Sequence, residues 1–256
     1  MTKRFRDKVV IVTGASSGIG RATAIEFGKE GARIALAARR LDECERAAEE
    51  VRAAGGEAIA IRTDVTDADS IRTMVAKTVE AYGGLDCAFN NAGIAGEISL
   101  PTHEHSKENW DNVISVNLTS VFLSMKYEIP EMLKTGGGAI VNNSSIYGLV
   151  GSTVGHVPYV ASKYGVIGLT QTAAYEYAKL GIRVNAVCPG YTRTENMQAS
   201  YDEGPERFDR EVMPHIPMDR FGEMVEIARL VLWLASDEAG YVTGQAIAAD
   251  GGWVAK

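Results

Sequence analysis

The sequence predicts an α/β fold, in which a doubly wound parallel sheet of about seven strands carries helices on both faces. Two observations predict this class. Short apolar runs alternate with helix-like segments along the chain, a rhythm typical of parallel strands joined by helical crossovers. The apolar runs also lack polar alternation, as expected for strands buried on both faces. Because no linker, repeat or low-complexity tract interrupts this rhythm, we predict a single domain over residues 1–256.

The first half of the chain supplies four of the expected strands. Apolar runs predict strands over Val9–Val12, Arg33–Ala38, Ala58–Ile61 and Leu85–Phe89. The expected helices between them are Arg21–Glu30, which stops at Gly31, a segment from a cap at Asp42 to Ala54, and a segment from Asp67 to Tyr82. Glycine at a helix end and aspartate at a helix start are the usual boundary signals.

The second half adds three strands and three helices. The strands are expected over Ala139–Asn142, Ile182–Cys188 and Gln245–Ala249, and the helices over Asn109–Lys134, Pro158–Lys179 and Val225–Ala235. Residues 191–222 lack this alternation and are rich in charge. We interpret them as an insert that covers the substrate in the ligand crevice. The alternative is a solvated pair of surface helices.

Composition limits the classes of partner. The net charge of −7 argues against nucleic acid or an anionic membrane as the main partner and disfavours acidic carrier proteins. No apolar run approaches the roughly 20 residues of a membrane span, and the charged N-terminal segment is no signal peptide. The three cysteines form neither a disulfide framework nor a metal-ligand pattern. We expect a cytoplasmic protein that binds a small molecule and no metal.

A glycine-rich turn follows the first predicted strand. Gly14, Gly18 and Gly20 have the spacing G-x-x-x-G-x-G, with hydroxyls at Ser16 and Ser17. Glycines at a strand-to-helix junction let the backbone approach a pyrophosphate, which then lies at the helix N-terminus. A packing turn also uses glycine, but this position favours dinucleotide binding.

The end of the second strand indicates which dinucleotide binds. An acidic residue at this point would accept a hydrogen bond from the ribose 2′-OH of NAD. The chain instead has Arg39 and Arg40, and its first acid is Asp42. Because arginine pairs with phosphate through two hydrogen bonds, Arg39 favours NADP. The alternative is NAD, with both arginines solvated.

Tyr159 and Lys163 lie four residues apart, on one face of the helix that Pro158 begins. A nearby ammonium and the positive end of the helix dipole both lower a phenol pKa from its usual value of about 10, so we expect a tyrosine suited to proton exchange. The same spacing recurs at Tyr175 and Lys179. Tyr175 is rotated by roughly 160° and displaced by about 24 Å along the helix, which predicts a packing or interface residue.

Several motifs together resemble the short-chain dehydrogenase/reductase family, and they follow one another in the family's order. They are Thr13 to Gly20, Asn90-Asn91-Ala92-Gly93, Asn117, Ser145, Tyr159-x-x-x-Lys163 and Pro189-Gly190. The resemblance covers Lys8 to Trp253 and implies a Rossmann-type domain. It also implies an NAD(P)-dependent enzyme that interconverts a ketone or aldehyde and a secondary alcohol.

The resemblance implies four catalytic residues. Tyr159 would be the general acid, which gives a proton to the carbonyl oxygen and takes it back in oxidation. Lys163 would lower the phenol pKa and hold the nicotinamide ribose. Ser145 would bind the substrate oxygen. Asn117 would help to hold a water beside Lys163, although a buried amide that satisfies backbone groups is an equally compatible interpretation.

The resemblance also implies a cofactor-binding set. Asp64 and Val65 would contact adenine, Asn91 would lie over the cofactor, and Thr192 would contact the nicotinamide carboxamide. The full set is Gly14, Ser16, Ser17, Gly18, Ile19, Gly20, Arg39, Asp64, Val65, Asn91, Ala92, Gly93, Tyr159, Lys163, Pro189, Gly190 and Thr192.

Two features depart from the family pattern. Ser145 precedes Tyr159 by 14 residues, where the family usually has 13. Ser144 is the alternative, but neighbours on a strand point in opposite directions, so we favour Ser145. Ser17 stands where NADP-preferring relatives often carry a basic residue, which leaves Arg39 as the main signal for NADP.

The substrate site and the assembly follow from the same resemblance. The expected walls are Ile94–Leu100, Ile146–Val157 and the insert, and their apolar members suggest a neutral ketone or secondary alcohol. His156 and His215 can orient a polar substituent, although ordinary surface histidines are the alternative.

Related proteins pair the helices over residues 109–134 and 158–179 between subunits, which predicts a homotetramer.

The sequence leaves other functions open. An NAD-dependent dehydrogenase of a neutral alcohol or sugar is the first alternative. A non-catalytic nucleotide-binding sensor on the same fold is the second, and dehydration or epimerisation on the same scaffold is the third. The identity of the substrate does not follow from the sequence.

Overall fold

A seven-stranded sheet forms the centre of the protein, as described by a computed structural model over residues 3–152 and 154–255. The strand order is β3-β2-β1-β4-β5-β6-β7, and every neighbouring pair is parallel. The strands are β1 (Val9–Thr13), β2 (Arg33–Ala38), β3 (Glu57–Arg62), β4 (Cys87–Asn90), β5 (Gly138–Asn143), β6 (Ile182–Pro189) and β7 (Ala246–Ala249). The predicted fold class is confirmed.

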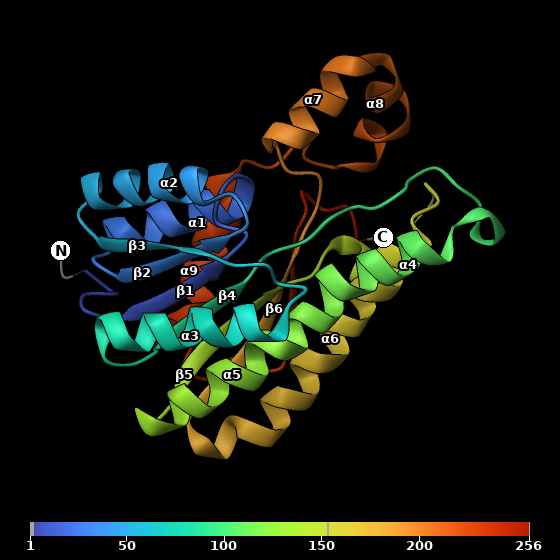
Figure 1. Cartoon of the computed structure of the whole chain (residues 1–256). Coiled ribbons are helices and arrows are strands. Elements are labelled where there is room, and N and C mark those ends of the chain that lie inside the picture. Colours follow the sequence, from blue (N-terminus) through green and yellow to red (C-terminus); the bar gives the residue numbers. More distant parts are fainter. Residues whose placement is uncertain (1–2, 153, 256) are drawn as a thin grey trace.

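Helices cover both faces of the sheet (Figure 1). One layer holds α1 (Gly18–Lys29), α2 (Leu41–Ala53) and α9 (Met224–Ala235), and the other holds α3 (Ala68–Tyr82), α5 (Ser120–Lys134) and α6 (Val157–Tyr177). Helix α4 (Lys107–Ile114) precedes α5 and packs on α6. Short 3₁₀ turns lie at Thr102–Glu104, Ile146–Gly148, Ala178–Leu180, Met213–His215 and Asp237–Ala239.

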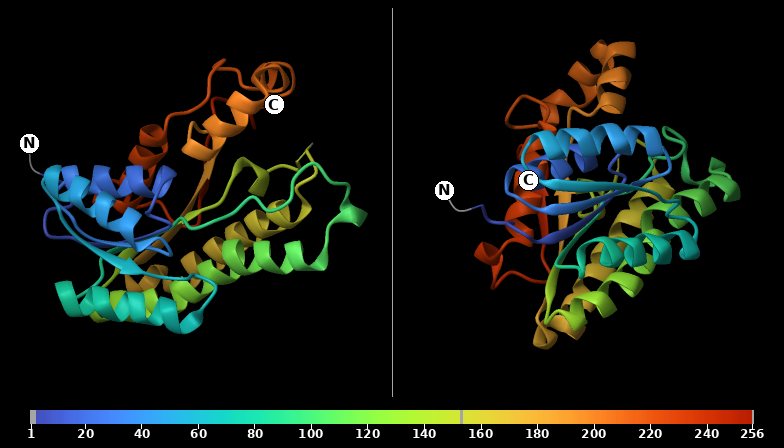
Figure 2. Two further views of the ribbon diagram at one scale, coloured as in Figure 1. Left: turned by 45° about the horizontal axis from the view of Figure 1, so that its top comes forward. Right: turned by 60° about the vertical axis from the view of Figure 1, so that its left-hand side comes forward.

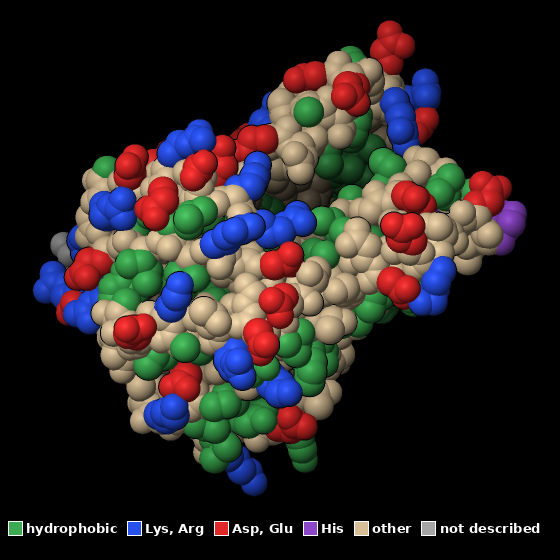
Figure 3. All heavy atoms as spheres, in the orientation of Figure 1, with side chains coloured by type: hydrophobic (Ala, Val, Ile, Leu, Met, Phe, Trp, Pro, Cys, Tyr) green, Lys and Arg blue, Asp and Glu red, His purple; other side chains and the backbone are tan. Residues whose placement is uncertain are grey.

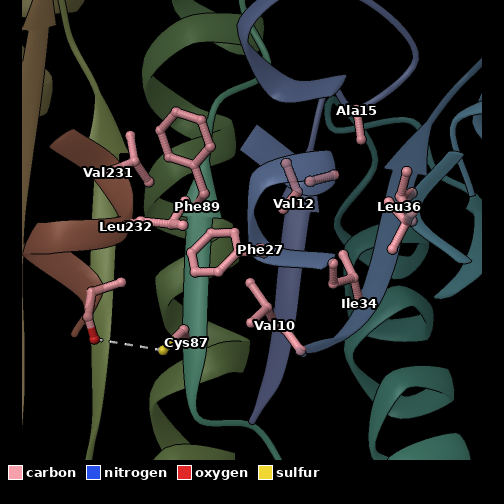
Figure 4. Packing of buried hydrophobic residues seen from close by; sticks show 14 of the residues in the cluster. Val10, Val12, Ala15, Phe27, Ile34, Leu36, Cys87, Phe89, Val231 and Leu232 are labelled. Atoms are coloured by element: carbon pink, nitrogen blue, oxygen red, sulfur yellow. Dashed lines mark hydrogen bonds between the residues drawn. The ribbon is translucent and has the colours of Figure 1, made fainter. Parts of the chain in front are cut away.

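Apolar packing on both sides of the sheet explains why the strands lack polar alternation. All five residues of β1 are buried. On the face toward α1 and α9, Phe27 and Val231 pack with Val10 and Phe89 (Figure 4). On the other face, Ile11 packs in a cluster to which α3, α5 and α6 contribute. Burial of this kind contributes roughly 1.5–3 kcal/mol for each large side chain.

The order of the strands determines where a crevice for a ligand can form. From β1 the chain moves outward to β2 and β3 and then returns to β4 on the other side of β1. At such a reversal, the two connections leave in opposite directions and open a crevice at the carboxyl ends of the strands. The glycine-rich turn after β1 and the loop after β4 therefore meet at one edge of the sheet.

The predicted cap at Asp42 is wrong by two residues. Helix α2 begins at Leu41, and Arg40 occupies the N-cap position without a side-chain cap. Asp42 lies within the first turn, where a carboxylate still interacts favourably with the positive end of the helix dipole.

The predicted single helix over Asn109–Lys134 is also wrong in detail. A π-helical turn, Ser115–Thr119, separates α4 from α5. The helix begins two residues earlier than expected, because the Ser106 side chain accepts a hydrogen bond from the Asn109 backbone N–H at 3.0 Å. A π turn inserts a residue into the helix and often occurs at functional sites, and this one carries the fully buried Asn117.

Residues 191–222 form a small lobe beyond the sheet edge. Helices α7 (Glu195–Glu203) and α8 (Pro205–Glu211) stand away from the two main layers (Figures 1 and 2). The lobe has its own cluster, in which Phe221 packs with Tyr201 and Phe208. A parallel β-bridge between Thr192 and Gly222 joins its two ends.

Neither a membrane-spanning helix nor a metal-binding cluster occurs among the described residues. Across residues 3–152 and 154–255, no helix is long and apolar enough to cross a bilayer. The same residues contain no cluster of three or more His, Cys, Asp or Glu side chains arranged to hold a metal ion. All three cysteines are free and buried. Burial raises the thiol pKa of Cys44 and Cys188 to about 11 and that of Cys87 to about 12.

A buried carboxyl group lies beneath the sheet at Glu128 of α5, which has no solvent exposure. The Asn90 side chain donates hydrogen bonds to Glu128 Oε2 and to Asn142 Oδ1, both at 3.1 Å. Asn142 in turn donates to Thr170 Oγ1 at 3.0 Å. Burial raises the pKa of Glu128 to about 7, against a smaller lowering by the bond from Asn90. The site therefore favours a protonated carboxyl group.

Glu128→Gln should change how stability depends on pH. The folded pKa of about 7 exceeds the ordinary value of 4.5. Wild-type stability should therefore fall as pH rises from about 4.5 to 7 and level off above, by roughly 3 kcal/mol at most. The variant has no carboxyl group to ionise, so its free energy of unfolding should rise relative to wild type by about 1–3 kcal/mol between pH 5 and pH 8.

Urea unfolding at both pH values, at one protein concentration, measures this difference. Glu131→Gln is a matched control on the same helix, where Glu131 pairs with Lys134 near the surface, and it should keep the wild-type pH profile. Equal pH profiles for wild type and Glu128→Gln would contradict the prediction.

Candidate active site

A crevice of about 1080 Å³ opens at the carboxyl ends of the strands. This volume exceeds the roughly 300–1,000 Å³ of a typical ligand pocket and is large enough for a dinucleotide with a substrate beside it. Figure 3 shows the hollow between the main body and the overhanging lobe, with apolar side chains inside it. The predicted residues that line it are Gly14, Ser16, Ser17, Gly18, Ile19, Arg39, Asp64, Val65, Asn91, Ala92, Gly93, Ser145, Tyr159, Lys163, Pro189 and Gly190.

The glycine-rich turn depends on left-handed backbone and on close packing. Gly14 and Gly18 have φ values of +65° and +60°, a region that glycine enters without a steric penalty. A Cβ at Gly20 would lie 2.5 Å from Asn91 Nδ2 and 2.5 Å from the Gly14 carbonyl oxygen. Gly20 therefore serves the approach of α1 to β4, and it is not among the residues that line the crevice.

Two charged side chains, from Arg40 and Glu195, contact this turn. Arg40 donates to Ser16 Oγ at 3.0 Å and to Ser17 Oγ at 2.9 Å. The Glu195 carboxylate of α7 accepts a hydrogen bond from the Gly18 backbone N–H at 3.1 Å. The turn is thus bound by a cation on one side and by an anion at the N-terminus of α1.

Arg39 and Asp64 lie near one another in the crevice. Hydrogen bonds from Thr66 lower the pKa of Asp64, and the positive charge of Arg39 lowers it further. Both arginines after β2 line the crevice, so the predicted cationic character of this end is present. The sequence alone does not indicate which of these two adjacent arginines contacts the glycine-rich turn.

Tyr159 and Lys163 lie on the first turns of α6, as their spacing predicts. Lys163 is 3% exposed, and its Nζ donates to the Asn143 carbonyl oxygen at 2.7 Å. The same Nζ lies 5.4 Å from the centroid of the Tyr159 ring. The lysine is thus fixed by β5 and placed beside the phenol.

The expected lowering of the Tyr159 pKa by Lys163 is wrong. Burial raises the pKa of the phenol, and a hydrogen bond with the Ser145 side chain lowers it only in part. Burial also lowers the pKa of Lys163 to about 8. The Lys163 ammonium gives its hydrogen bond to the Asn143 backbone carbonyl, and desolvation by the surrounding protein is the largest effect on the phenol pKa.

The structure separates the two candidate serines. Ser145 lines the crevice and interacts with Tyr159. The Ser144 hydroxyl points away and donates to the Lys163 carbonyl oxygen at 2.9 Å. The extra residue between Ser145 and Tyr159 therefore does not displace Ser145 from the phenol.

Asn117 binds the loop that follows β4. Its Oδ1 accepts from the Ile94 backbone N–H at 2.8 Å. Its Nδ2 donates to the Ile94 carbonyl oxygen at 2.9 Å and to Ser162 Oγ at 3.2 Å. These contacts match the interpretation of a buried amide that satisfies backbone groups. The role in holding a water stays a prediction.

Thr192 is buried behind the crevice wall. Its hydroxyl donates to the Gly190 carbonyl oxygen at 3.1 Å, and its exposed fraction is 5%. From this segment the crevice is lined instead by Tyr191, Thr194, Glu195, Asn196 and Met197. The contact between Thr192 and the nicotinamide carboxamide stays a prediction.

Aromatic side chains surround the part of the crevice beside Tyr159. The hydroxyls of Tyr147 and Tyr191 lie 3.0 Å apart and hydrogen-bond to each other. The His156 ring lies between Tyr147 and Tyr159, with its centroid 5.9 Å from each. Tyr147 and His156 belong to the predicted walls of the substrate site. No pattern in the sequence predicted the hydrogen bond between Tyr147 and Tyr191.

The fold and this site together define a dinucleotide-binding enzyme of the α/β class, and comparisons with known proteins identify its family. Residues 14–254 match a family model described as enoyl-(acyl carrier protein) reductase. A cyclohexanol dehydrogenase of Acinetobacter sp. (strain SE19) is 41% identical over 257 residues, which span 100% of this chain and 98% of the relative.

Solved structures give the same result. The crystal structure of levodione reductase has a TM-score of 0.92 and 37% identity, and the match covers 98% of this chain and 99% of that one. A variant actinorhodin polyketide ketoreductase with NADPH has a TM-score of 0.90 and 38% identity, with coverages of 96% and 97%.

The chain therefore belongs to the short-chain dehydrogenase/reductase family. It is an NAD(P)-dependent oxidoreductase of that type, which acts on CH–OH groups.

Proposed function

We propose that this protein is an NADP(H)-dependent oxidoreductase that interconverts a ketone or aldehyde and a secondary alcohol, with Tyr159 as the general acid and base. The observation that carries the proposal is the convergence of Tyr159, Ser145 and Lys163 on one crevice with the glycine-rich turn. The apolar residues beside them, such as Ile94 and Ile146, favour a neutral substrate.

The chain's own residues position the reacting groups. When the dinucleotide is bound, its nicotinamide supplies the hydride. Ser145 and Tyr159 hold the substrate oxygen with their hydroxyls, and the Tyr159 O–H gives its proton to the developing alkoxide. Lys163, held by the Asn143 carbonyl, places a positive charge near the ribose site and the phenol.

The direction of the pKa shift at Tyr159 favours its role as a proton donor. A phenol whose pKa is raised by burial stays protonated at neutral pH, as carbonyl reduction requires. Oxidation of an alcohol needs the phenolate, which must be stabilised by Lys163 and by the positive charge of an oxidised nicotinamide.

NADP is the cofactor that the basic end of the crevice favours. Arg39 and Arg40 follow β2 where an NAD-binding protein would have an acid, and both line the crevice. The structure of the similar ketoreductase contains NADPH. NAD, used without a strong contact to its ribose, is the alternative.

We also propose that residues 1–256 form one catalytic domain, in which the lobe over 191–222 covers the substrate. Met197 from α7 and Tyr191 reach the crevice from this lobe, which supports the proposal. The three buried free cysteines fit the reducing cytoplasm that we expect for this protein.

Tyr159→Phe tests the proton-transfer role. Loss of the hydroxyl should lower kcat/KM for ketone reduction by roughly 10²–10⁴-fold, measured as NADPH oxidation at 340 nm with a panel of ketones. The variant should still bind cofactor, as followed by NADPH fluorescence, because the turn after β1 is intact. Tyr175→Phe is the matched control, since Tyr175 has the same spacing to a lysine but is 91% exposed. Undiminished activity of Tyr159→Phe would refute the mechanism.

Substitution of the two arginines tests the choice of cofactor. A charge-assisted contact to a 2′-phosphate is worth roughly 1.5–3 kcal/mol. Arg39→Ala and Arg40→Ala together should therefore lower the ratio of kcat/KM for NADPH over NADH by about 10–100-fold. NADH is the internal control for damage to the fold. Equal wild-type values for the two cofactors would exclude NADP specificity, and a ratio that the double variant leaves unchanged would exclude the two arginines as its source.

We propose a homotetramer on the basis of apolar surface along α4, α5 and α6. Exposed side chains there are Trp110, Phe122, Leu133, Tyr164 and Tyr175, a concentration typical of an interface. Light scattering should give about four times the 27.5 kDa of one chain, and Phe122→Asp should lower that mass. A wild-type monomer would refute the assembly.

A further inference from the structure

His156 lies beside the proposed proton donor. It precedes the first residue of α6 and lines the crevice. Its ring meets those of Tyr147 and Tyr159 at interplanar angles of 82° and 64°, with both centroid distances at 5.9 Å. The imidazole therefore lies in the crevice next to the Tyr159 phenol.

Both nitrogens of this ring lack a partner. Nδ1 and Nε2 are shielded from solvent, and neither has a hydrogen-bond partner among residues 3–152 and 154–255. A buried donor or acceptor without a partner is destabilising, so such a group calls for an explanation. A molecule in the crevice can supply the missing partner once the ring turns, because both nitrogens are shielded in this structure.

The ring is expected to be neutral. Burial lowers the pKa of His156, and electrostatic interactions with His105 and Arg207 lower it further. A neutral imidazole offers one N–H donor and one acceptor nitrogen. It can therefore donate to a carbonyl or accept from a hydroxyl, without attracting a charged group.

Neighbouring polar groups are already engaged. The hydroxyls of Tyr147 and Tyr191 bond to each other at 3.0 Å, and Ser145 serves the reacting oxygen in the proposed function. The surrounding wall includes the apolar side chains of Ile94, Ile146 and Met197. His156 is thus a polar group in an apolar wall, with hydrogen-bonding capacity that the reaction itself does not use.

We propose that His156 is a specificity-determining residue that binds a second oxygen of the substrate. The inference rests on the proposed function and narrows its substrate class to neutral molecules with two oxygen functions, namely diols and the corresponding hydroxyketones or diketones. One oxygen reacts between Ser145 and Tyr159, and the other pairs with the imidazole. Because neutral imidazole both donates and accepts, it binds the hydroxyl and the carbonyl forms alike.

The proposal predicts a preference that can be measured as a ratio. A substrate without the second oxygen would leave the imidazole unpaired, and discrimination of this kind is strong when the unpaired group is buried. At about 1–3 kcal/mol for the lost pairing, the wild-type kcat/KM for the preferred isomer of cyclohexanediol should exceed that for cyclohexanol by roughly 10–100-fold.

The experiment compares this ratio among variants, with the 1,2-, 1,3- and 1,4-isomers of cyclohexanediol and with cyclohexanol as substrates. His156→Phe keeps a ring of similar size but no hydrogen bond, and it should lower the diol-to-cyclohexanol ratio at least tenfold. His156→Gln restores a donor and an acceptor and should recover part of the ratio. Because the readout is a ratio within one variant, partial loss of folded protein does not alter it.

The outcomes separate this inference from the proposed function. The role of His156 would be overturned if the diol-to-cyclohexanol ratio of kcat/KM for His156→Phe were within about twofold of the wild-type ratio. It would also be overturned if the wild-type protein preferred cyclohexanol. Either result would leave the reaction class intact. Tyr159→Phe should instead lower kcat/KM for every alcohol in the panel by roughly 10²–10⁴-fold. If the wild-type protein oxidised none of them with either cofactor, the proposed function would fail and this inference would fall with it.

Discussion

A chain of hydrogen bonds across three strand ends holds the site together. Thr13 Oγ1 at the end of β1 accepts from the backbone N–H groups of Asn91 and Ala92, at 2.9 and 3.1 Å. Asn91 Oδ1 then accepts from the Asn143 side chain at 3.0 Å, and the Asn143 carbonyl oxygen accepts from Lys163 at 2.7 Å. The crevice end of β1, from which the glycine-rich turn leaves, and the proposed catalytic lysine are therefore linked by short contacts. Rigid links of this kind maintain the geometry that positioning catalysis requires.

The sequence predicts those parts of this arrangement that depend on local patterns of residues. Unbroken apolar runs identified the strands because burial on both faces removes any polar alternation. The strand-to-helix position of Gly14 and Gly18 identified the crevice, since both residues adopt the left-handed backbone that such a turn requires. The spacing of Tyr159 and Lys163 identified their common helix face. Each of these signals lies within about eight residues of sequence.

The parts that the sequence did not predict depend on tertiary environment. The phenol of Tyr159 and the ammonium of Lys163 are near one another, as expected, yet burial sets both of their pKa shifts. How deeply a residue is buried is decided by the whole fold and not by its neighbours in sequence. The π turn at Asn117 has the same origin, because its amide is held by Ile94 and Ser162, residues well separated from it along the chain.

The contact between Glu195 and Gly18 connects the lobe to the cofactor turn. A backbone N–H at a helix N-terminus favours an anion, and here the Gly18 N–H is bound to the Glu195 carboxylate at 3.1 Å. The sequence predicts a pyrophosphate at the same donor, and two anions repel one another at one donor. Glu195 stands at the start of α7, directly after the capping residue Thr194. A pyrophosphate bound at this turn would therefore compete with the Glu195 carboxylate for the Gly18 N–H, and the contact links the cofactor turn to the lobe that contributes Met197 to the crevice.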